Sequence, residues 1–557
     1  MHRTRSTPID MLDHWAETQP DRVFLRQPEG GRYRELTWRQ VRDQARQVAG
    51  ALRHLGLHPG DRVALLAKNC AEWFVADLAM MLGGYVSVPI FPTANANTIR
   101  YILEHSESRA VFVGKLDRPR RQAAALGEGI LRLGLPYDTV TVDHEWDALL
   151  GLGEPLVDAP RPAAGQTMTI VYTSGSTGKP KGVVHTFASL SWAGKTLALD
   201  LQATAEDRSV SYLPLAHITE RVYIEMGSFF AGNTVAFVES RASFIKDVTR
   251  AEPTLFISVP RLWALFREQI LAQLGERKLD VLLKIPRLAE FMCLRLRRKL
   301  GLEHARSLGC GSAPVDPELL VWYEKIGLHI SQGWGMTENA AYGTIHHPFR
   351  SDKIASVGRA ALGAEIKLSD QGELLFKSPG LMREYYKQPQ ETAAVMTDDG
   401  FLRSGDLADI DADGYVFISG RVKDIFKTAK GLYVSPVPIE QELIREDSVD
   451  LACVIGSGLP QPIAVVQLVA ASRSQQRETV RARLQATLDR VNATLSHHER
   501  LDAIVVDETP WSVENNLLTP TLKVKRHVLE RRFAAQPARP RGGRVHWQDE
   551  LANTPSA

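Results

Sequence analysis

The segment from Tyr172 to Val183 constrains this chain more than any other. It reads Tyr-Thr-Ser-Gly-Ser-Thr-Gly-Lys-Pro-Lys-Gly-Val and follows an apolar run, residues 168–171, that predicts a strand. Glycines let the backbone approach a ligand closely, and N–H groups, hydroxyls and ammonium groups are what a polyphosphate requires. The segment therefore predicts a loop that binds a nucleoside triphosphate through Thr173, Ser174, Gly175, Ser176, Thr177, Gly178 and Lys181.

Two common phosphate-binding loops do not fit this segment. A Walker A loop needs G-x-x-x-x-G-K-[ST], but only two residues separate Gly175 from Gly178, and Pro180 follows Lys179. Proline has neither the hydroxyl that would bind Mg²⁺ nor a backbone N–H. The dinucleotide pattern G-x-G-x-x-G is also missing from the segment. Taken alone, a Gly/Ser/Thr-rich stretch is also typical of a flexible surface loop.

The segment resembles the phosphate-binding signature of the adenylate-forming superfamily, which includes acyl-CoA synthetases, luciferases and the adenylation domains of peptide synthetases. Four further segments follow in the order of that family, so the resemblance covers roughly residues 10–535. It implies an α/β fold, with a large multi-subdomain N-terminal adenylation domain of layered, mostly parallel sheets and a small mobile α+β C-terminal domain. The implied bounds are 1–421 and 422–535, followed by a disordered tail, 536–557.

The second signature is Gly333-Trp334-Gly335-Met336-Thr337-Glu338. An aromatic face can stack on adenine, and a hydroxyl beside a carboxylate can hold phosphate and Mg²⁺. The resemblance implies nucleotide contacts along this segment and at Gly311, Ser312 and Ala313, with Glu338 and Thr173 as metal ligands. The alternative is a glycine-rich turn with a helix beginning at Thr337.

The remaining signatures lie nearer the C-terminus. The resemblance assigns Asp406 to the ribose hydroxyls, Arg421 to ribose or phosphate, and Lys423 to the pivot of the small domain. It also implies that Lys523 is catalytic, together with Glu338, Lys181 and Thr337. Taken alone, Asp406 is more typical of a turn aspartate, and the basic residues of these C-terminal signatures are more typical of solvated surface charges. The acidic run Asp409–Gly414 matches the opening of an EF-hand loop, but Gly420 occupies the twelfth position, so we predict a hairpin turn.

Three segments are closest to the long-chain branch of the superfamily: 213–221, with His217 in the acyl or CoA region, 426–436 and 517–523. Leu432 departs from that pattern, where lysine is expected. The implied reaction is ATP-dependent activation of a fatty, long-chain carboxylic acid through an acyl-adenylate, followed by transfer to coenzyme A. ATP, Mg²⁺ and CoA as co-substrate are the implied small molecules. A ligase that loads a carrier protein and a non-catalytic nucleotide-binding homologue remain alternatives.

Composition limits the other classes of function. The 557 residues exceed one core, and the net charge of +2 gives no indication of a nucleic-acid partner. Four cysteines without C-x-x-C spacing fit a reducing compartment and argue against a zinc site. The first residues lack an apolar signal core, and charged residues interrupt the most apolar stretch, 63–91, so we expect a cytoplasmic protein, as a monomer or homodimer. The basic segment 290–299 is either a solvated helix face or a peripheral membrane contact.

Overall fold

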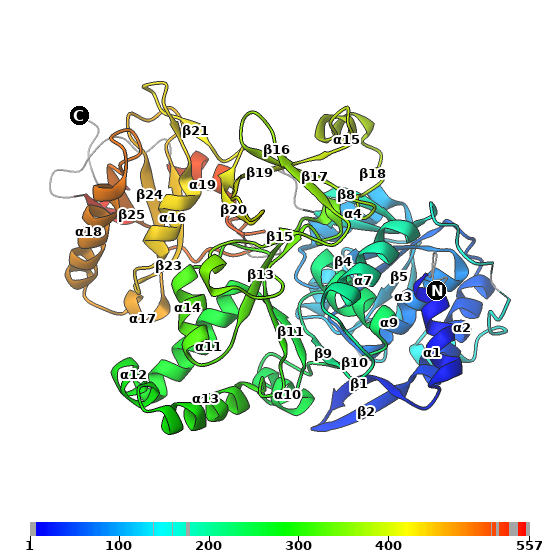
Figure 1. Ribbon diagram of the computed structural model, residues 1–557. Helices are drawn as coiled ribbons and strands as arrows, with labels where there is room; N and C mark the ends of the chain where they lie inside the picture. Colours follow the sequence, from blue (N-terminus) through cyan, green and yellow to red (C-terminus); the bar gives the residue numbers. More distant parts are fainter. Residues whose placement is uncertain are drawn as a thin grey trace. The chain divides into compact units, whose positions relative to one another are not determined.

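The computed structural model describes residues 7–137, 139–158, 160–173, 179–513, 515–519, 523–533 and 544–552 (Figure 1). The chain divides into two compact units. Unit 1 comprises Met1–Lys367, Leu375–Arg403 and Ile410–Val416, and unit 2 comprises Leu368–Leu374, Ser404–Asp409 and Phe417–Ala557. The alternation of strands and helices in unit 1 confirms the predicted α/β class.

The first large sheet of unit 1 has seven strands in the order β18-β8-β7-β4-β3-β5-β6. Its centre is parallel, and β7, β8 and β18 form an antiparallel edge. The strands are β3 Arg62–Leu66, β4 Val86–Ile90, β5 Ser108–Val113, β6 Leu131–Gly134, β7 Thr167–Thr173, β8 Lys181–Thr186 and β18 Glu384–Tyr385.

The second large sheet has nine strands in the order β15-β14-β13-β12-β11-β9-β10-β1-β2. Neighbours from β1 to β13 are parallel, and the outer strands are antiparallel. The strands are β1 Val23–Glu29, β2 Arg32–Thr37, β9 Arg208–Ser211, β10 Thr234–Phe237, β11 Leu255–Ser258, β12 Ser307–Cys310, β13 Ile330–Trp334, β14 Thr344–Ile345 and β15 Arg359–Ala360.

Helix α3, Ala71–Gly83, belongs to a core shared by the two sheets. Every residue from Ala71 to Leu82 is buried, and the two acidic residues of this otherwise apolar helix are paired, Glu72 with Arg34 and Asp77 with Arg221. Its Phe74 meets Phe237 of β10 edge-on at 5.3 Å, and the same hydrophobic cluster includes Val63 of β3. Helix α2, Trp38–His54, packs on α3 and begins at a capping box formed by Thr37 and Gln40.

Helices on the chain between β11 and β13 cover one face of the nine-stranded sheet. Phe256, Leu308 and Ile330 lie side by side on the three strands and share a buried cluster with Trp263 and Phe266 of α11. The helices of this stretch are α11 Pro260–Leu274, α12 Glu276–Leu283, α13 Pro286–Leu300 and α14 Pro317–Lys325.

The other helices of unit 1 are short and mostly connect strands. They are α1 Pro8–Thr18, α4 Ala96–Ser106, α5 Pro119–Ala123, α6 Trp146–Leu150, α7 Phe187–Asp200, α8 Ile218–Glu220, the π-helix η1 Arg221–Met226, α9 Gly227–Ala231, α10 Phe244–Ala251, the 3₁₀ turns η2 Thr337–Asn339 and η3 Ser351–Lys353, and α15 Pro389–Val395. No helix among the described residues is long and apolar enough to cross a membrane.

A four-stranded sheet, in the order β16-β17-β19-β20, contributes residues to both units. Its strands are β16 Glu365–Leu368, β17 Glu373–Lys377, β19 Leu402–Ile410 and β20 Val416–Arg421. The acidic run Asp409–Gly414 is the turn between β19 and β20, as predicted. Lys353 pairs with Asp411 at 2.7 Å and with Asp413 at 2.8 Å, so a lysine ammonium balances the charge of these two carboxylates.

Unit 2 contains a sheet of order β23-β24-β25-β26 beside α16 and α18. The expected disordered tail is wrong for residues 544–552, because β26 pairs in parallel with β25 and buries Val545 and Trp547. The elements are β21 Phe426–Lys427, β22 Tyr433–Val434, α16 Pro436–Ile444, β23 Val449–Ile455, β24 Ile463–Leu468, α17 Ala470–Arg473, α18 Arg477–Thr494, β25 Ala503–Val506, α19 Arg526–Phe533, β26 Val545–Trp547 and α20 Gln548–Ala552.

Candidate active site

The aromatic signature lies at the carboxyl end of β13. The Trp334 ring packs directly on Gly343, where an added Cβ would come within 2.5 Å of the ring, and it meets Phe376 edge-on at 6.1 Å. Gly335 approaches Ala341 so closely that a Cβ would lie 2.4 Å from the carbonyl carbon. Because neither glycine can carry a side chain without movement of its neighbours, these contacts define the position of the indole.

Glu338 and Lys181 come from separate signatures and meet at Tyr385. The Tyr385 hydroxyl donates to Oε1 of Glu338 at 2.6 Å, and the Lys181 ammonium lies 4.9 Å from the centre of the same ring. Lys181 also pairs with Glu391 at 2.5 Å. Burial, and then the charge of Glu338, raise the pKa of Tyr385, so its hydroxyl remains protonated and donates.

His185 supports the backbone next to this carboxylate. Its Nε2 lies 2.7 Å from the carbonyl oxygen of Thr337, and Nδ1 lies 3.2 Å from the Ser189 hydroxyl. A carbonyl only accepts, so Nε2 carries the proton. Burial lowers the pKa of His185 to about 4, which keeps the ring neutral near pH 7. The ring therefore fixes Thr337 without adding charge to the site.

The phosphate-binding segment connects two antiparallel strands. Thr173, at the end of β7, lies directly opposite Lys181, at the start of β8. The carbonyl of Pro180 accepts from the Tyr101 hydroxyl at 3.1 Å, and the Lys179 ammonium lies 5.8 Å from the same ring. The predicted contacts of Ser174, Gly175, Ser176, Thr177 and Gly178 lie outside the described residues.

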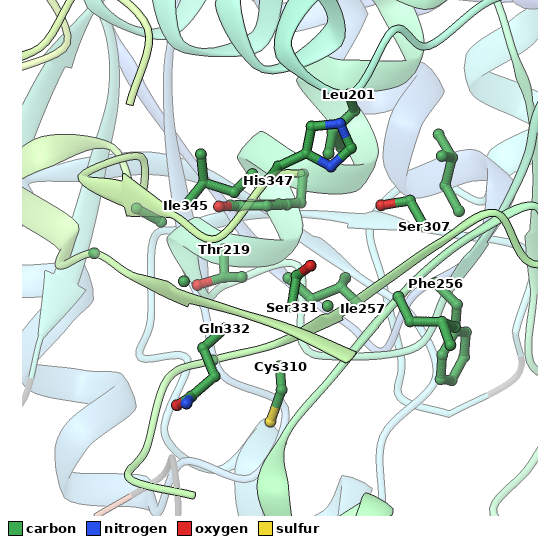
Figure 2. A pocket seen from close by; sticks show the side chains of 18 of the residues that line it. Leu201, Thr219, Phe256, Ile257, Ser307, Cys310, Ser331, Gln332, Ile345 and His347 are labelled. Atoms are coloured by element: carbon green, nitrogen blue, oxygen red, sulfur yellow. The ribbon is translucent and has the colours of Figure 1, made fainter. Parts of the chain in front are cut away.

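A pocket lies on the face of the nine-stranded sheet opposite α11–α14 (Figure 2). Ile257, Gly309 and Ser331 lie side by side on β11, β12 and β13 and line it. Figure 2 shows Ser331 pointing toward Thr219, while Cys310 and Gln332 point to the other side. A glycine inside a strand leaves room for a ligand to approach the backbone.

One end of this pocket is formed by residues that the resemblance assigns to the nucleotide. Gly311, Ser312 and residues 333–335 line it at the carboxyl ends of the strands. Ser312 has a left-handed backbone, with φ of 69°, and its hydroxyl lies 3.5 Å from that of Thr219. Such a conformation is costly for a residue with a side chain and is concentrated at functional sites.

Three further predicted residues lie around this region. Ala313 is exposed and is not one of the residues that line the pocket. Met336 packs against a small cluster that contains Val183 and Tyr385. His217 caps helix α8, because its Nδ1 accepts from the Thr219 backbone N–H at 3.2 Å.

The opposite wall of the pocket comes from α8 and η1, which contribute Thr219, Tyr223 and Ile224. The same helical segment is anchored on its other side by Arg221. This residue is fully buried, pairs with Asp77 of α3 at 2.6 Å, and donates to the Ser87 hydroxyl of β4 at 3.0 Å. A π-helix is rare and is often found at functional sites.

Two more buried carboxyls complete this anchor. Glu220 accepts from the Ser211 hydroxyl and the Tyr212 N–H, at 2.8 and 2.9 Å. Burial raises the pKa of Glu220 to about 8, and burial followed by the charge of Asp77 raises the pKa of Glu225. Arg221 therefore balances Asp77, while Glu220 and Glu225 remain largely protonated near neutral pH.

The predicted residues of unit 2 form a separate group. Arg421 pairs with the buried Asp406 at 2.9 Å, so the structure brings two of the signatures together. Lys423 is exposed in the turn after β20. Lys523 is also exposed; its backbone N–H donates to the Thr519 hydroxyl at 3.0 Å, and its carbonyl accepts from the Thr519 backbone N–H at 2.8 Å.

Comparison with known proteins decides the family. The sequence profile of AMP-binding enzymes matches residues 12–386, and that of the AMP-binding enzyme C-terminal domain matches residues 423–536. This chain belongs to the AMP-binding enzyme family. Like other members of that family, it is an adenylate-forming enzyme, which confirms the resemblance found in the sequence.

Among similar family members, the long-chain-fatty-acid–CoA ligase FadD15 of Mycobacterium bovis is 28% identical, over 94% of this chain and 95% of that protein. The peroxisomal acyl-CoA ligase 891 of Penicillium roqueforti is 29% identical, over 89% and 83%. Two solved structures share the fold. The anthranilate CoA ligase AuaEII has a TM-score of 0.78 at 22% identity, over 95% of this chain and 98% of that one. The o-succinylbenzoate CoA synthetase from Bacillus subtilis has a TM-score of 0.75 at 22% identity, over 95% of this chain and 98% of that one.

Sequence reasoning missed Tyr385, His185, Arg221 as an anchor, and the small residues of the pocket. Tyr385 and His185 stand outside the signatures, and nothing in their local sequence marks them. Arg221 lies in the Glu-Arg pair of segment 213–221, but its partners Asp77 and Ser87 are more than a hundred residues away. Gly309 and Ser331 also lie outside the signatures, and no strand is predicted at either position.

We expect Tyr385→Phe to lower the free energy of unfolding by about 1–3 kcal/mol, because the buried Glu338 carboxylate loses a donor. Urea denaturation measures this change. Tyr386→Phe, which removes a hydroxyl from the next residue, is the matched control. Equal stability of the two variants would show that the Tyr385–Glu338 bond contributes nothing.

Glu220→Gln tests the buried protonated carboxyl. A folded-state pKa of about 8, against 4.5 for an unperturbed group, means that the folded protein holds a proton that the unfolded chain loses between these values. Stability therefore declines as the pH rises from 4.5 to 8, by about 4 kcal/mol from this group.

Gln cannot ionise, so the decline in apparent Tm between pH 5 and pH 8 should be smaller in this variant than in the parent. Any constant cost of the amide affects all pH values alike and leaves this slope unchanged. Glu268→Gln, at an exposed position of α11, is the control. The assignment fails if Glu220→Gln and the parent lose equal Tm over this range.

Proposed function

We propose that this enzyme activates a fatty, long-chain carboxylic acid with ATP and then transfers the acyl group to coenzyme A. The observation that carries the proposal is the pocket on the nine-stranded sheet. Gly311, Ser312 and Gly335 line its end at the nucleotide signature, and Leu255 and Ser307 line its other end, at the amino ends of the strands. Gly311 follows Ser307 by four positions along extended chain, which corresponds to about 13 Å.

The lining of the pocket favours an acyl chain over a polar acid. Four apolar side chains line the pocket: Leu201, Ile224, Ile257 and Ile345. Gly309 and Ser331 also line it, and their small size leaves space above the sheet. Apolar pockets with a few polar groups at one end suit amphiphilic ligands. The names of the similar family members, long-chain-fatty-acid–CoA ligase and acyl-CoA ligase, point in the same direction.

In the first half-reaction, a carboxylate oxygen of the acid attacks the α-phosphorus of ATP. The bond from that phosphorus to the β-phosphate bridging oxygen breaks, giving acyl-adenylate and pyrophosphate. Two anions must approach one another, so positive charge and hydrogen-bond donors are required. Lys181, the loop residues 173–178 and Lys523 are the groups of this chain assigned to that role.

Mg²⁺ would neutralise charge on the phosphate oxygens. It prefers oxygen ligands and is commonly bound by one or two carboxylates together with substrate phosphates. The described residues contain no cluster of three or more His, Cys, Asp or Glu side chains that could hold a metal ion alone. We assign Glu338 and Thr173 to such a shared site. The hydrogen bond that the Tyr385 hydroxyl donates to Oε1 of Glu338 orients this carboxylate.

The second half-reaction needs a different arrangement of the same site. The CoA thiol loses its proton and attacks the acyl carbon, the carbon–oxygen bond to AMP breaks, and AMP leaves. We assign Lys423 as the pivot about which a small domain, residues 422–535, moves relative to a large domain, residues 1–421. Leu432 and Tyr433, exposed on the β21–β22 hairpin, are candidate contacts for CoA. Asp406 is assigned to ribose, and Arg421 to ribose or phosphate.

The test is AMP release from ATP and CoA across free fatty acids of increasing chain length, with an aryl acid panel beside them. We expect a maximum among the long-chain acids. Flat release across both panels, with or without CoA, would overturn the proposed substrate. Activity with a phosphopantetheinylated carrier protein in place of CoA would instead favour the carrier-loading alternative.

Gly309→Val places a branched side chain on the pocket floor, where even a Cβ lies 3.2 Å from Ile257. We expect kcat/KM to fall at least tenfold for the preferred long acid and to change little for short acids. A tenfold fall corresponds to a loss of about 1.4 kcal/mol of transition-state stabilisation. Ser331→Ala, which adds no volume, is the control. An unchanged chain-length profile would show that the acyl chain lies elsewhere.

Two lysine variants separate the half-reactions. Lys523→Ala should slow adenylate formation by about a hundred- to a thousandfold, yet leave thioester formation from supplied acyl-adenylate within a few fold. Lys525→Ala is the control for a lost positive charge. Lys423→Pro, which stiffens the pivot, should instead impair the thioester step more. Equal losses in both steps for both variants would contradict the assigned roles.

A further inference from the structure

Helices α12 and α13 lie side by side at the surface of unit 1 and expose large apolar side chains (Figure 1). Val281 is 60% exposed, Ile285 52% and Phe291 58%. Phe291 is the only phenylalanine that is exposed among the described residues. Exposed side chains of this size cost free energy in water, so a cluster of them marks an interaction surface.

The same helical pair is strongly basic. Residues 276–299 contain eight Lys or Arg against three Asp or Glu, whereas the whole chain has a net charge of only +2. Two of the acids are neutralised by neighbours outside this segment, since Glu276 pairs with Arg267 at 3.5 Å and Asp280 with Lys325 at 4.0 Å.

The basic and apolar side chains alternate along the exposed stripes of both helices. In α13, Arg287 and Arg295 flank Phe291 at a spacing of four residues, which places all three on one face. Lys284 lies between the helices, next to Ile285. Among the described residues, Lys284, Arg287 and Arg295 form no ion pair with an acidic group. The opposite face of α13 is buried through Met292, Leu296 and Leu300.

We infer that α12 and α13 bind an anionic lipid surface, with Val281, Ile285 and Phe291 inserted among the lipids and Lys284, Arg287 and Arg295 beside the phosphates. Apolar anchors between unpaired cations are the pattern of an interfacial helix. A second copy of this chain is a poor occupant, because a symmetric contact would place the same positive charges opposite each other. An anionic bilayer supplies both the apolar layer and the opposite charge.

The position of the helices in the chain connects this surface with the pocket. They belong to the crossover between β11 and β12, the two strands that carry Ile257 and Gly309. A lipid-bound crossover would keep the pocket near the phase into which long-chain acids partition. That consequence rests on the proposed function, whereas lipid binding itself does not depend on it.

The experiment is co-sedimentation of the full chain, without ATP or fatty acid, with vesicles of phosphatidylcholine alone or mixed with phosphatidylglycerol. We expect binding to the mixed vesicles that weakens in about 0.5 M NaCl, because salt screens surface charge. No binding to the mixed vesicles at low salt would overturn the inference, and so would equal binding to both vesicle types.

Variants locate the surface. Arg287→Glu with Arg295→Glu should lower the partition coefficient about tenfold or more, and Phe291→Ser should lower it severalfold. Arg120→Glu with Arg121→Glu changes the net charge equally at an exposed site on α5, and Leu199→Ser removes an equally exposed apolar group. Equal losses in test and control variants would overturn the location. Unchanged AMP release in detergent for all four separates this result from a failure of the proposed function.

Discussion

The buried ion pair between Arg221 and Asp77 joins η1, which lines the pocket of the nine-stranded sheet, to the core between the two large sheets of unit 1. Arg221 belongs to η1, Asp77 to the core helix α3, and the Ser87 hydroxyl that also accepts from Arg221 belongs to β4 of the other sheet. All three groups are removed from water, so each needs its partners. Removing one member of such a pair costs about 3–5 kcal/mol, since it leaves an uncompensated charge.

This constraint explains how one helical segment forms a wall of the site. Arg221 holds one side of η1, so Thr219, Tyr223 and Ile224 reach the pocket from a defined direction. The sheet surface opposite them leaves space for a ligand, because the paired residues Gly309 of β12 and Ser331 of β13 have small side chains or none. The pocket then reaches the carboxyl ends of parallel strands, the usual position of ligand sites in α/β sheets.

Much of the architecture can be predicted from local sequence patterns. The strand predicted from residues 168–171 is β7, and the acidic run Asp409–Gly414 forms the predicted turn, because the local residue pattern determines both. The signatures can be recognised for the same reason, since each is a short run of residues. Tyr385 and His185 cannot, because each acts on Glu338 or Thr337 across the fold rather than within a local motif. That residues 544–552 are folded cannot be predicted from local sequence either, because this segment is buried only when β26 pairs with β25.

The sequence by itself determined the family, the order of the signatures and the α/β pattern, since these depend on the types of neighbouring residues and their spacing along the chain. The tertiary structure alone decided which distant groups share an environment. It placed the Lys181 ammonium over the Tyr385 ring and Glu338 at the Tyr385 hydroxyl, and it buried Glu220 so that the pKa of its carboxyl rises to about 8. It also left Phe291 in solvent between two arginines. Burial and charge pairing depend on neighbours hundreds of residues apart, and only folding brings those neighbours together.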